Sequence, residues 1–206
     1  MTVVNPLKAL RPKKELVEAI AALPYDVYNR EEAKAVVEAN ALSFLQIDRG
    51  ETLLSDDIST YDPLVYKTAA SRLEEMIDAH EFVYDQEESY YIYELERLGK
   101  IQRGIVGCVL AKEYEAGIIK KHENTREVKE NDRINHIDAL KAHTGPIFLT
   151  YKNRDDIQQV INKIMVDAEV IFEFTGDDGI RHKGYQINNP SAMEDIKAVT
   201  KSMEAL

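Results

Sequence analysis

The sequence predicts an α+β fold, with a mixed or mainly antiparallel sheet built from hairpins and flanked by amphipathic helices. Two pairs of β-rich runs are each joined by a glycine-containing turn, at Gly99-Lys100 and at Gly176 to Gly179, which is typical of hairpins. Elsewhere apolar residues recur every three or four positions, as on one face of a helix. With 206 residues the chain can bury a core, and we expect a single α+β module over residues 1–206.

Apolar periodicity and stop signals predict the helices in order. Pro24 ends the first, because proline lacks an amide hydrogen and restricts the residue before it. Asn29 is a suitable N-cap for the second, and Gly145-Pro146 stops the fourth. The predicted helices are Lys13–Ala22, Arg30–Ala39, Leu64–His80, Asn124–Lys141, Asp155–Val166 and a tail from Ser191.

Short apolar runs bounded by turn residues predict the strands. Gly104 and Gly107 inside one run indicate a bulge or a close backbone approach. The tail pattern stops at Leu206 without a capping glycine, so we expect the chain to be part of a longer protein. The predicted strands are Ser43–Ile47, Tyr90–Leu95, Ile101–Leu110, Ile147–Tyr151, Glu169–Thr175 and Ile180–Ile187, and residues 51–63 are predicted to form an acidic surface loop.

Composition limits the class of protein. Lys and Arg number 26 and Asp and Glu 37, a formal net charge of −11, which repels a phosphate backbone, so we expect no general nucleic-acid binding. No apolar run approaches the ~20 residues of a membrane span, and the first residues lack a secretion signal. Cys108 is the single cysteine. This excludes an internal disulfide, favours a cytoplasmic location, and leaves Cys108 as a core residue.

One segment concentrates positive charge. On a helix at 100° per residue, four cationic or titratable side chains fall within an arc of roughly 80°, and His122 joins them if the helix begins early. We call this set the basic strip: Arg126, Lys129, Arg133 and His136. Because like charges so close together repel one another, the strip needs a neutralising partner.

Two neutralising partners are possible. Glu123 or Glu130 can reach Arg126 or Arg133 at helical spacing, for about 0.2–0.5 kcal/mol per pair. Alternatively the strip binds a small phosphorylated anion, since a guanidinium group holds phosphate oxygens in a two-pronged geometry. The spacing leaves both readings open.

Neighbouring residues suggest further roles. His122 could act as a general acid or base, or be an ordinary surface histidine. Glu123 could be a base, a magnesium ligand or a favourable first-turn acid. Thr125 could cap the helix or donate to an anion, and Lys121 adds a cation. In a separate turn after Pro24, Tyr25 and Asp26 are a second candidate site, although Asp is also ordinary in turns.

Other features favour structural roles. Arg181 and His182 lie on a predicted strand and are expected to face water. The tyrosines are interpreted as packing residues rather than a stacking platform for nucleic acid; they are Tyr61, Tyr66, Tyr84, Tyr90, Tyr91, Tyr93 and Tyr114. The phosphate-binding P-loop, the dinucleotide fingerprint, the paired-histidine zinc motif and the Gly-x-Ser-x-Gly turn are absent from the sequence.

Several segments together resemble a bacterial and archaeal protein family, the domain of unknown function 1015 (DUF1015). The His-Glu-x-Thr-Arg block is the most specific part, and the resemblance spans nearly the whole chain. Leu23 departs from it, because the family usually has a second proline there. The segments are Pro24-Tyr25-Asp26-Val27, Ser43-Phe44-Leu45, Lys121 to Arg126, Lys129-Glu130, Asp132-Arg133 and Thr144 to Tyr151.

The resemblance implies more than the spacing does. Family members are about twice this length, so the chain would be the N-terminal half of a protein of about 400 residues. Their second half carries an Asp-Gly-His-His-Arg segment similar to the phosphate-handling motif of ParB-like and sulfiredoxin-like proteins, a group that includes free-serine kinases. By this fold-level analogy the chain would belong to a small-molecule phosphotransferase. It would use a nucleotide or pyrophosphate donor with Mg²⁺, and His122 or Glu123 would act on the acceptor hydroxyl.

Two other functions remain open. The chain could be a non-catalytic binding or regulatory module whose basic strip docks an acidic partner or the second half of the protein. The ParB analogy alone suggests specific nucleic-acid binding, against which the net charge of −11 argues.

Overall fold

A computed structural model describes residues 3–121 and 125–201 and divides the chain into two compact units. The sheet unit comprises Met1–Lys14, Tyr84–Asn124 and Phe148–Leu206, and the helical unit comprises Glu15–Val83 and Thr125–Ile147. Each unit is therefore assembled from segments far apart in the sequence. That the two units act as a single module stays a prediction.

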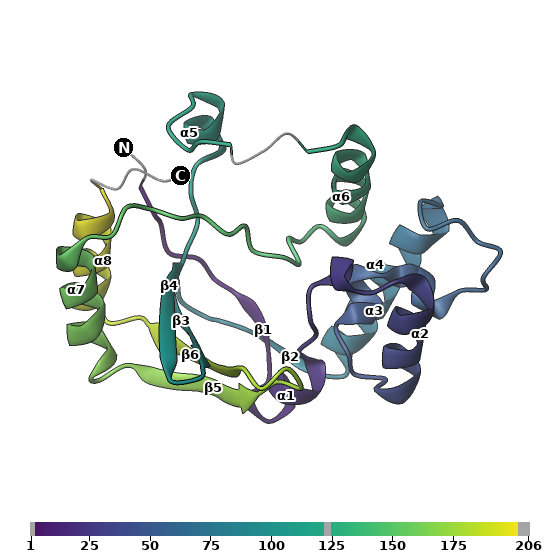
Figure 1. The fold of residues 1–206 in the computed structure, drawn as a ribbon, viewed down its shortest axis with the longest axis horizontal. Helices are drawn as coiled ribbons and strands as arrows, with labels where there is room; N and C mark the ends of the chain where they lie inside the picture. Colours follow the sequence, from purple (N-terminus) through teal and green to yellow (C-terminus); the bar gives the residue numbers. More distant parts are fainter. Residues whose placement is uncertain (1–2, 122–124, 202–206) are drawn as a thin grey trace. The chain divides into compact units, whose positions relative to one another are not determined.

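The sheet unit is built on a four-stranded antiparallel sheet with the order β4-β3-β6-β5 (Figure 1). Both hairpins expected from the sequence are present, β3 with β4 and β5 with β6, and β3 pairs with β6 to join them. The strands of this sheet are β3 (Tyr90–Arg97), β4 (Lys100–Val106), β5 (Glu169–Thr175) and β6 (Arg181–Ile187), and two further strands are short, β1 (Leu10–Pro12) and β2 (Phe82–Tyr84).

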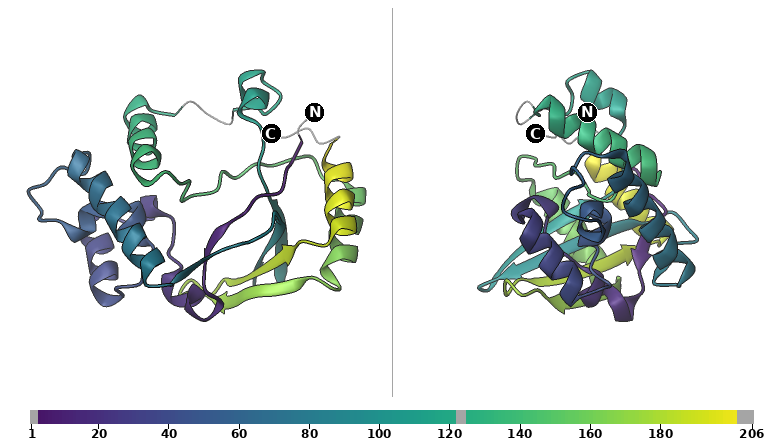
Figure 2. Two further views of the ribbon diagram at one scale, coloured as in Figure 1. Left: turned by 180° about the vertical axis from the view of Figure 1, so that it is seen from behind. Right: turned by 90° about the vertical axis from the view of Figure 1, so that its right-hand side faces the viewer.

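Helices α7 (Asp155–Met165) and α8 (Pro190–Thr200) lie side by side against one face of this sheet (Figures 1 and 2). Their apolar faces bury Ile157, Ile161 and Ile196 against alternate residues of the strands, as the predicted periodicity requires. The remaining helix of this unit is α5 (Ala111–Glu115). Gly107 approaches the backbone closely, as expected: an added Cβ would lie 2.8 Å from the carbonyl oxygen of Asn5.

The helical unit packs short helices around α4. Its longest elements agree with the sequence: α4 begins at Pro63 behind the cap Asp62, and Asn29 forms a complete capping box with Glu32 at the start of α2. The elements are α1 (Val17–Ile20), η2 (Tyr25–Val27), α2 (Arg30–Ala39), α3 (Leu45–Asp48), η3 (Gly50–Leu53), α4 (Pro63–Asp78) and α6 (Glu127–Leu140), and the 3-10 turn η1 (Lys14–Leu16) crosses from one unit to the other.

Two predicted strands are wrong. Residues 43–47 end in helix α3, where Leu45, Gln46 and Ile47 are all buried, because a short apolar run does not distinguish a strand from a fully buried turn of helix. Residues 147–150 are extended but belong to no strand, and Ile147 and Phe148 are 84% and 75% exposed. The first predicted helix is also shorter than expected: only Val17–Ile20 is α-helical.

The predictions for Cys108 and for the tyrosines also need correction. Cys108 is exposed rather than in the core. Tyr61, Tyr84 and Tyr114 are exposed, whereas Tyr66, Tyr90 and Tyr91 are buried, so only some of the tyrosines are core residues.

His182 does not simply face water. It is half-buried, hydrogen-bonds through Nδ1 to the Tyr93 hydroxyl at 2.6 Å, and stacks on Phe174 with 4.7 Å between ring centroids. Burial lowers the pKa of His182 because it disfavours the charged form. A strand's alternation places a residue on one face but does not say what covers that face.

Candidate functional site

Helix α6 carries three residues of the basic strip, Lys129, Arg133 and His136, on the side of the helix that packs against the rest of the helical unit. The helix runs from Glu127 to Leu140, with Arg126 as the extended N-cap and Lys141 as a left-handed C-cap with φ 54°. Its inward face buries Asp132, His136 and Leu140. Lys129, Arg133 and His136 therefore share a face, as the spacing predicted, but the C-terminal part of that face is packed.

Arg133 is held between an aromatic ring and a carboxylate. Its guanidinium carbon lies 4.4 Å from the centroid of the Tyr25 ring, and Nη2 donates to Asp132 Oδ2 at 3.0 Å. These contacts fix the plane of the guanidinium. That hydrogen bond is the one Arg133 makes within the described chain, and its buried Nε has no partner there. The group is thus fixed in place with most of its five N–H donors unused.

Asp132 is shared between α6 and α4. Its Oδ2 accepts from Arg133, and its Oδ1 accepts from the Tyr66 hydroxyl at 3.0 Å. Burial raises the pKa of Tyr66, and the neighbouring Asp132 raises it further. The tyrosine is therefore a neutral donor at physiological pH, and it anchors the carboxylate that orients Arg133.

His136 follows Arg133 by three residues on α6, and its side chain is buried, with 2% of its surface exposed. Its Nε2 lies 2.9 Å from the carbonyl oxygen of Ile47, and because a carbonyl can only accept, Nε2 carries the hydrogen. In the neutral ring Nδ1 is then the acceptor. Burial lowers the pKa of His136, and the hydrogen bond to Ile47 opposes that effect.

Asp48 follows Ile47 and belongs to the same cluster. Thr144 Oγ1 donates to its Oδ1 at 2.7 Å. Burial raises the pKa of Asp48, although the Thr144 hydrogen bond and the charges of His136 and Arg133 oppose the shift. A cation beside an imidazole and a carboxylate whose pKa values are both shifted, as those of His136 and Asp48 are, is an arrangement typical of functional sites.

The burial of His136 predicts a pH dependence of stability. Folding lowers the pKa of His136, so near pH 6.5 the unfolded chain binds a proton that the folded chain does not bind. The free energy of unfolding therefore falls as the pH drops below 6.5. The slope can reach about 1.4 kcal/mol per pH unit. In urea titrations between pH 7.5 and 5.5, His136→Gln should be less stable at pH 7.5 but show a smaller slope than the wild type. Equal slopes would contradict this assignment.

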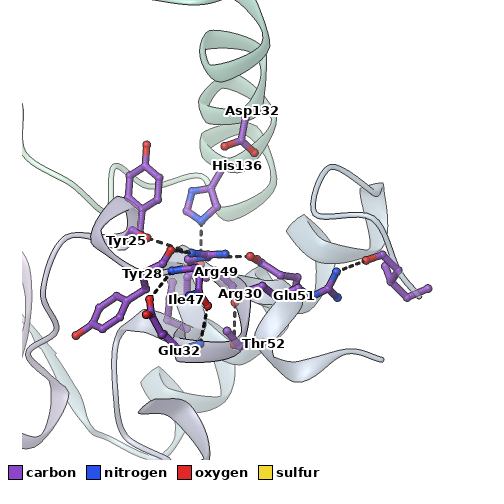
Figure 3. A network of polar contacts seen from close by, with 12 residues as sticks. Tyr25, Tyr28, Arg30, Glu32, Ile47, Arg49, Glu51, Thr52, Asp132 and His136 are labelled. Carbon is purple, nitrogen blue, oxygen red and sulfur yellow. Dashed lines mark hydrogen bonds and ion pairs between the residues drawn. The ribbon is translucent and has the colours of Figure 1, made fainter. Parts of the chain in front are cut away.

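Arg49 fixes the loop that carries Tyr25 (Figure 3). Its Nη1 donates to the carbonyl oxygens of Tyr25 and Tyr28 at 3.3 and 2.5 Å, and its Nε donates to Glu51 Oε1 at 2.8 Å. The Arg49 and Glu51 side chains are 14% and 6% exposed. In Figure 3 the Tyr25 carbonyl faces Arg49, while its ring extends away from the network. Arg49 therefore positions the ring against which Arg133 packs.

The other predicted site residues are distributed unevenly. Thr125, Arg126 and Asp26 are exposed in the helical unit, and Lys129 places Nζ 5.8 Å from the centroid of Tyr61. Lys121 belongs to the sheet unit, with Nζ 5.2 Å from the centroid of Tyr114. His122 and Glu123 lie outside the described residues. Apart from Lys121, the described site residues thus belong to one unit, and within it Tyr25 and Arg133 are in contact.

The sequence of the chain matches the profile of a family described as "Protein of unknown function (DUF1015)" over residues 4–206. The chain belongs to this family. Neither a curated protein nor a solved structure matches the chain. The helices of the described residues include none that is long and apolar enough to cross a membrane.

Several segments of the DUF1015 resemblance lie wholly or partly in the helical unit, and four of them contribute residues around this cluster. They contribute Tyr25, the start of α3, the Asp132-Arg133 pair and Thr144. Residues separated by more than a hundred positions are thus brought to one place, which gives the resemblance a structural basis.

Sequence reasoning missed five residues of the site: Asp48, Arg49, Tyr66, Asp132 and Thr144. Asp132 and Thr144 belong to segments of the DUF1015 resemblance, and this could have marked them as candidate site residues. Asp48 and Arg49 carried none, because they follow a run interpreted as a strand. The described residues contain no group of three or more His, Cys, Asp or Glu placed to hold a metal ion.

Proposed function

We propose that the helical unit binds a small phosphorylated anion at Arg133 and the exposed first turn of α6, and that the chain serves a small-molecule phosphotransferase. The observation that carries this proposal is the state of Arg133. The guanidinium is held by Tyr25 and Asp132, yet its two Nη groups together make one hydrogen bond among the described residues, and the side chain is 29% exposed. A fixed guanidinium loses little conformational entropy when it binds phosphate oxygens.

The charges around Arg133 support an anionic ligand. Within the described residues, neither Arg126 nor Lys129 forms an ion pair, and Arg133 pairs with Asp132 rather than with Glu130. Lys129 and Arg133 are four residues apart on α6 and repel each other by about 0.2–0.5 kcal/mol. The helix N-terminus adds a positive partial charge, and Arg126 makes no side-chain cap hydrogen bond there. An anion at the first turn of α6 would neutralise Lys129 and Arg133 and accept from the free N–H groups of the helix N-terminus.

The proposed reaction is transfer of a phosphoryl group to a hydroxyl of a small metabolite, as in free-serine kinases. The hydroxyl oxygen attacks phosphorus, the bond to the leaving phosphate breaks, and His122 or Glu123 takes the hydroxyl proton. Arg126, Lys129 and Arg133 bind the phosphate oxygens, since this reaction depends mainly on positioning and charge stabilisation. A Mg²⁺ ion would be bound chiefly by the phosphates of a nucleotide or pyrophosphate donor.

Calorimetry with pyrophosphate, phosphoserine, ADP and ATP tests the proposal at moderate salt. Arg133→Ala should weaken binding by about 10- to 100-fold, the equivalent of about 1.5–3 kcal/mol for a hydrogen bond to a charged group. Arg103→Ala is the matched control, because Arg103 also pairs with a buried carboxylate, Glu94, and is 27% exposed against 29% for Arg133. It should leave binding unchanged.

The rival is a non-catalytic module whose basic strip docks an acidic partner or the second half of the protein. The charge reversals Arg126→Glu and Arg133→Glu distinguish the two. A phosphate site loses ligand binding while the fold is kept, whereas a docking strip loses assembly with its partner. No heat from any of the four ligands with the wild-type chain would rule out the phosphate site.

A further inference from the structure

A groove between α4 and α6 lies beside the proposed phosphate site, within the helical unit. Its volume is about 460 Å³, inside the range of roughly 300–1,000 Å³ of small-molecule sites. We call it the Tyr61 groove. It is lined by Tyr61, Pro63, Tyr66, Lys67, Ala70, Asn135, Asp138 and Ala139.

The walls of the Tyr61 groove suit a flat ring. Tyr61 is 44% exposed and offers an aromatic surface, while Ala70 and Ala139 occupy little space between the two helices. Stacking of a base on an aromatic side chain contributes about 1–3 kcal/mol. A phosphate group alone would leave this aromatic wall unused.

The polar groups of the groove are arranged by charge. Asn135 carries an amide that both donates and accepts, and Asp138 carries a carboxylate that accepts from hydroxyl groups and repels phosphates. The cation Lys129 lies over Tyr61 at 5.8 Å. The ammonium group therefore lies at the Tyr61 end of the groove, within reach of the phosphates of a nucleotide whose base stacks on that ring.

We infer that the Tyr61 groove binds the nucleoside part of a nucleoside diphosphate or triphosphate, with its phosphates directed toward Lys129. The base stacks on Tyr61, Asn135 and Asp138 hydrogen-bond to the base edge and the ribose, and Asp138 sets the orientation by repelling the phosphates. This inference rests on the proposed function, because it assigns the phosphoryl donor of the same site to the nucleotides rather than to pyrophosphate.

The test compares ADP with pyrophosphate in calorimetry on the 206-residue chain. ADP should bind at least tenfold more tightly than pyrophosphate, because only ADP reaches the groove. Ala139→Phe, which fills the groove, should remove that difference while leaving the affinity for pyrophosphate within twofold. Ala35→Phe is the matched control: Ala35 is exposed on α2 of the same unit, and its replacement should change neither affinity.

The outcomes separate the two proposals. If pyrophosphate binds and ADP binds no more tightly, or if Ala139→Phe leaves the ADP preference intact, the groove is not a nucleoside site and the phosphate site survives. If neither ligand binds, both proposals fail. If Ala139→Phe loses cooperative thermal unfolding, Asp138→Lys replaces it: attraction of the phosphates to the wrong end should weaken ADP relative to pyrophosphate, and an unchanged ratio would overturn the inference.

Discussion

Arg49→Ala should destabilise the helical unit by about 3–5 kcal/mol, the usual cost of breaking a buried ion pair by removing one partner. Glu51 would be left as a 6% exposed carboxylate without its cation, and the carbonyls of Tyr25 and Tyr28 would lose their donor. The loop that carries Tyr25 would also lose its hydrogen bonds to Arg49. We therefore expect both the free energy of unfolding and the affinity for pyrophosphate at Arg133 to fall. Urea unfolding and pyrophosphate calorimetry measure the two effects.

Lys34→Ala is the control for an exposed pair. Lys34 pairs with Asp56, which is 78% exposed, so its removal should leave the urea unfolding curve almost unchanged. The double variant Arg49→Met with Glu51→Leu should be more stable than Arg49→Ala, because no buried charge remains unpaired. A loss below about 1 kcal/mol for Arg49→Ala would show that water replaces the guanidinium at little cost.

Gly50→Ala should be the second large effect, because η3 approaches the backbone of α4 at this residue. A Cβ at Gly50 would lie 2.3 Å from the carbonyl oxygen of Val65 and 3.1 Å from the Ala69 side chain. A backbone carbonyl inside a helix cannot rotate away, so η3 must shift, at a cost of about 1–3 kcal/mol or more. Because Arg49 and Glu51 flank Gly50, pyrophosphate binding should fall as well.

Gly145→Ala is the matched control in the same unit. An added Cβ at Gly145 meets nothing within 4 Å, so the free energy of unfolding should change by less than about 0.5 kcal/mol. Equal unfolding free energies for the two variants in urea would mean that η3 moves freely against α4, contrary to the packing described above.

Local signals predicted the regular elements well where they were complete. The Asn29 cap of α2, the apolar spacing of α4 and the glycine turns of both hairpins are short-range patterns, and the structure has each of them. The sheet order β4-β3-β6-β5 could not be predicted in the same way. It depends on pairing β3 with β6, ninety residues later, which no local pattern specifies.

The candidate site shows the same division. Helical spacing alone places Lys129, Arg133 and His136 on one face of α6, because 100° per residue is a property of the backbone. Spacing does not reveal which way that face turns. Packing against α3 and α4 buries His136, whose Nε2 hydrogen-bonds to the carbonyl oxygen of Ile47. Arg133 then forms an ion pair with Asp132 and packs on the Tyr25 ring.

By itself the sequence determined the α+β class, the membership of the DUF1015 family and the clustering of cations on one helix, since each follows from patterns within a few turns or from a motif read along the chain. Only the tertiary structure decided that Arg49 holds the Tyr25 loop, that Asp48 and Thr144 complete the cluster, and that a groove runs beside α6. These contacts join residues 20 to 100 positions apart, and their energies depend on burial, which arises only when distant segments exclude water from one another.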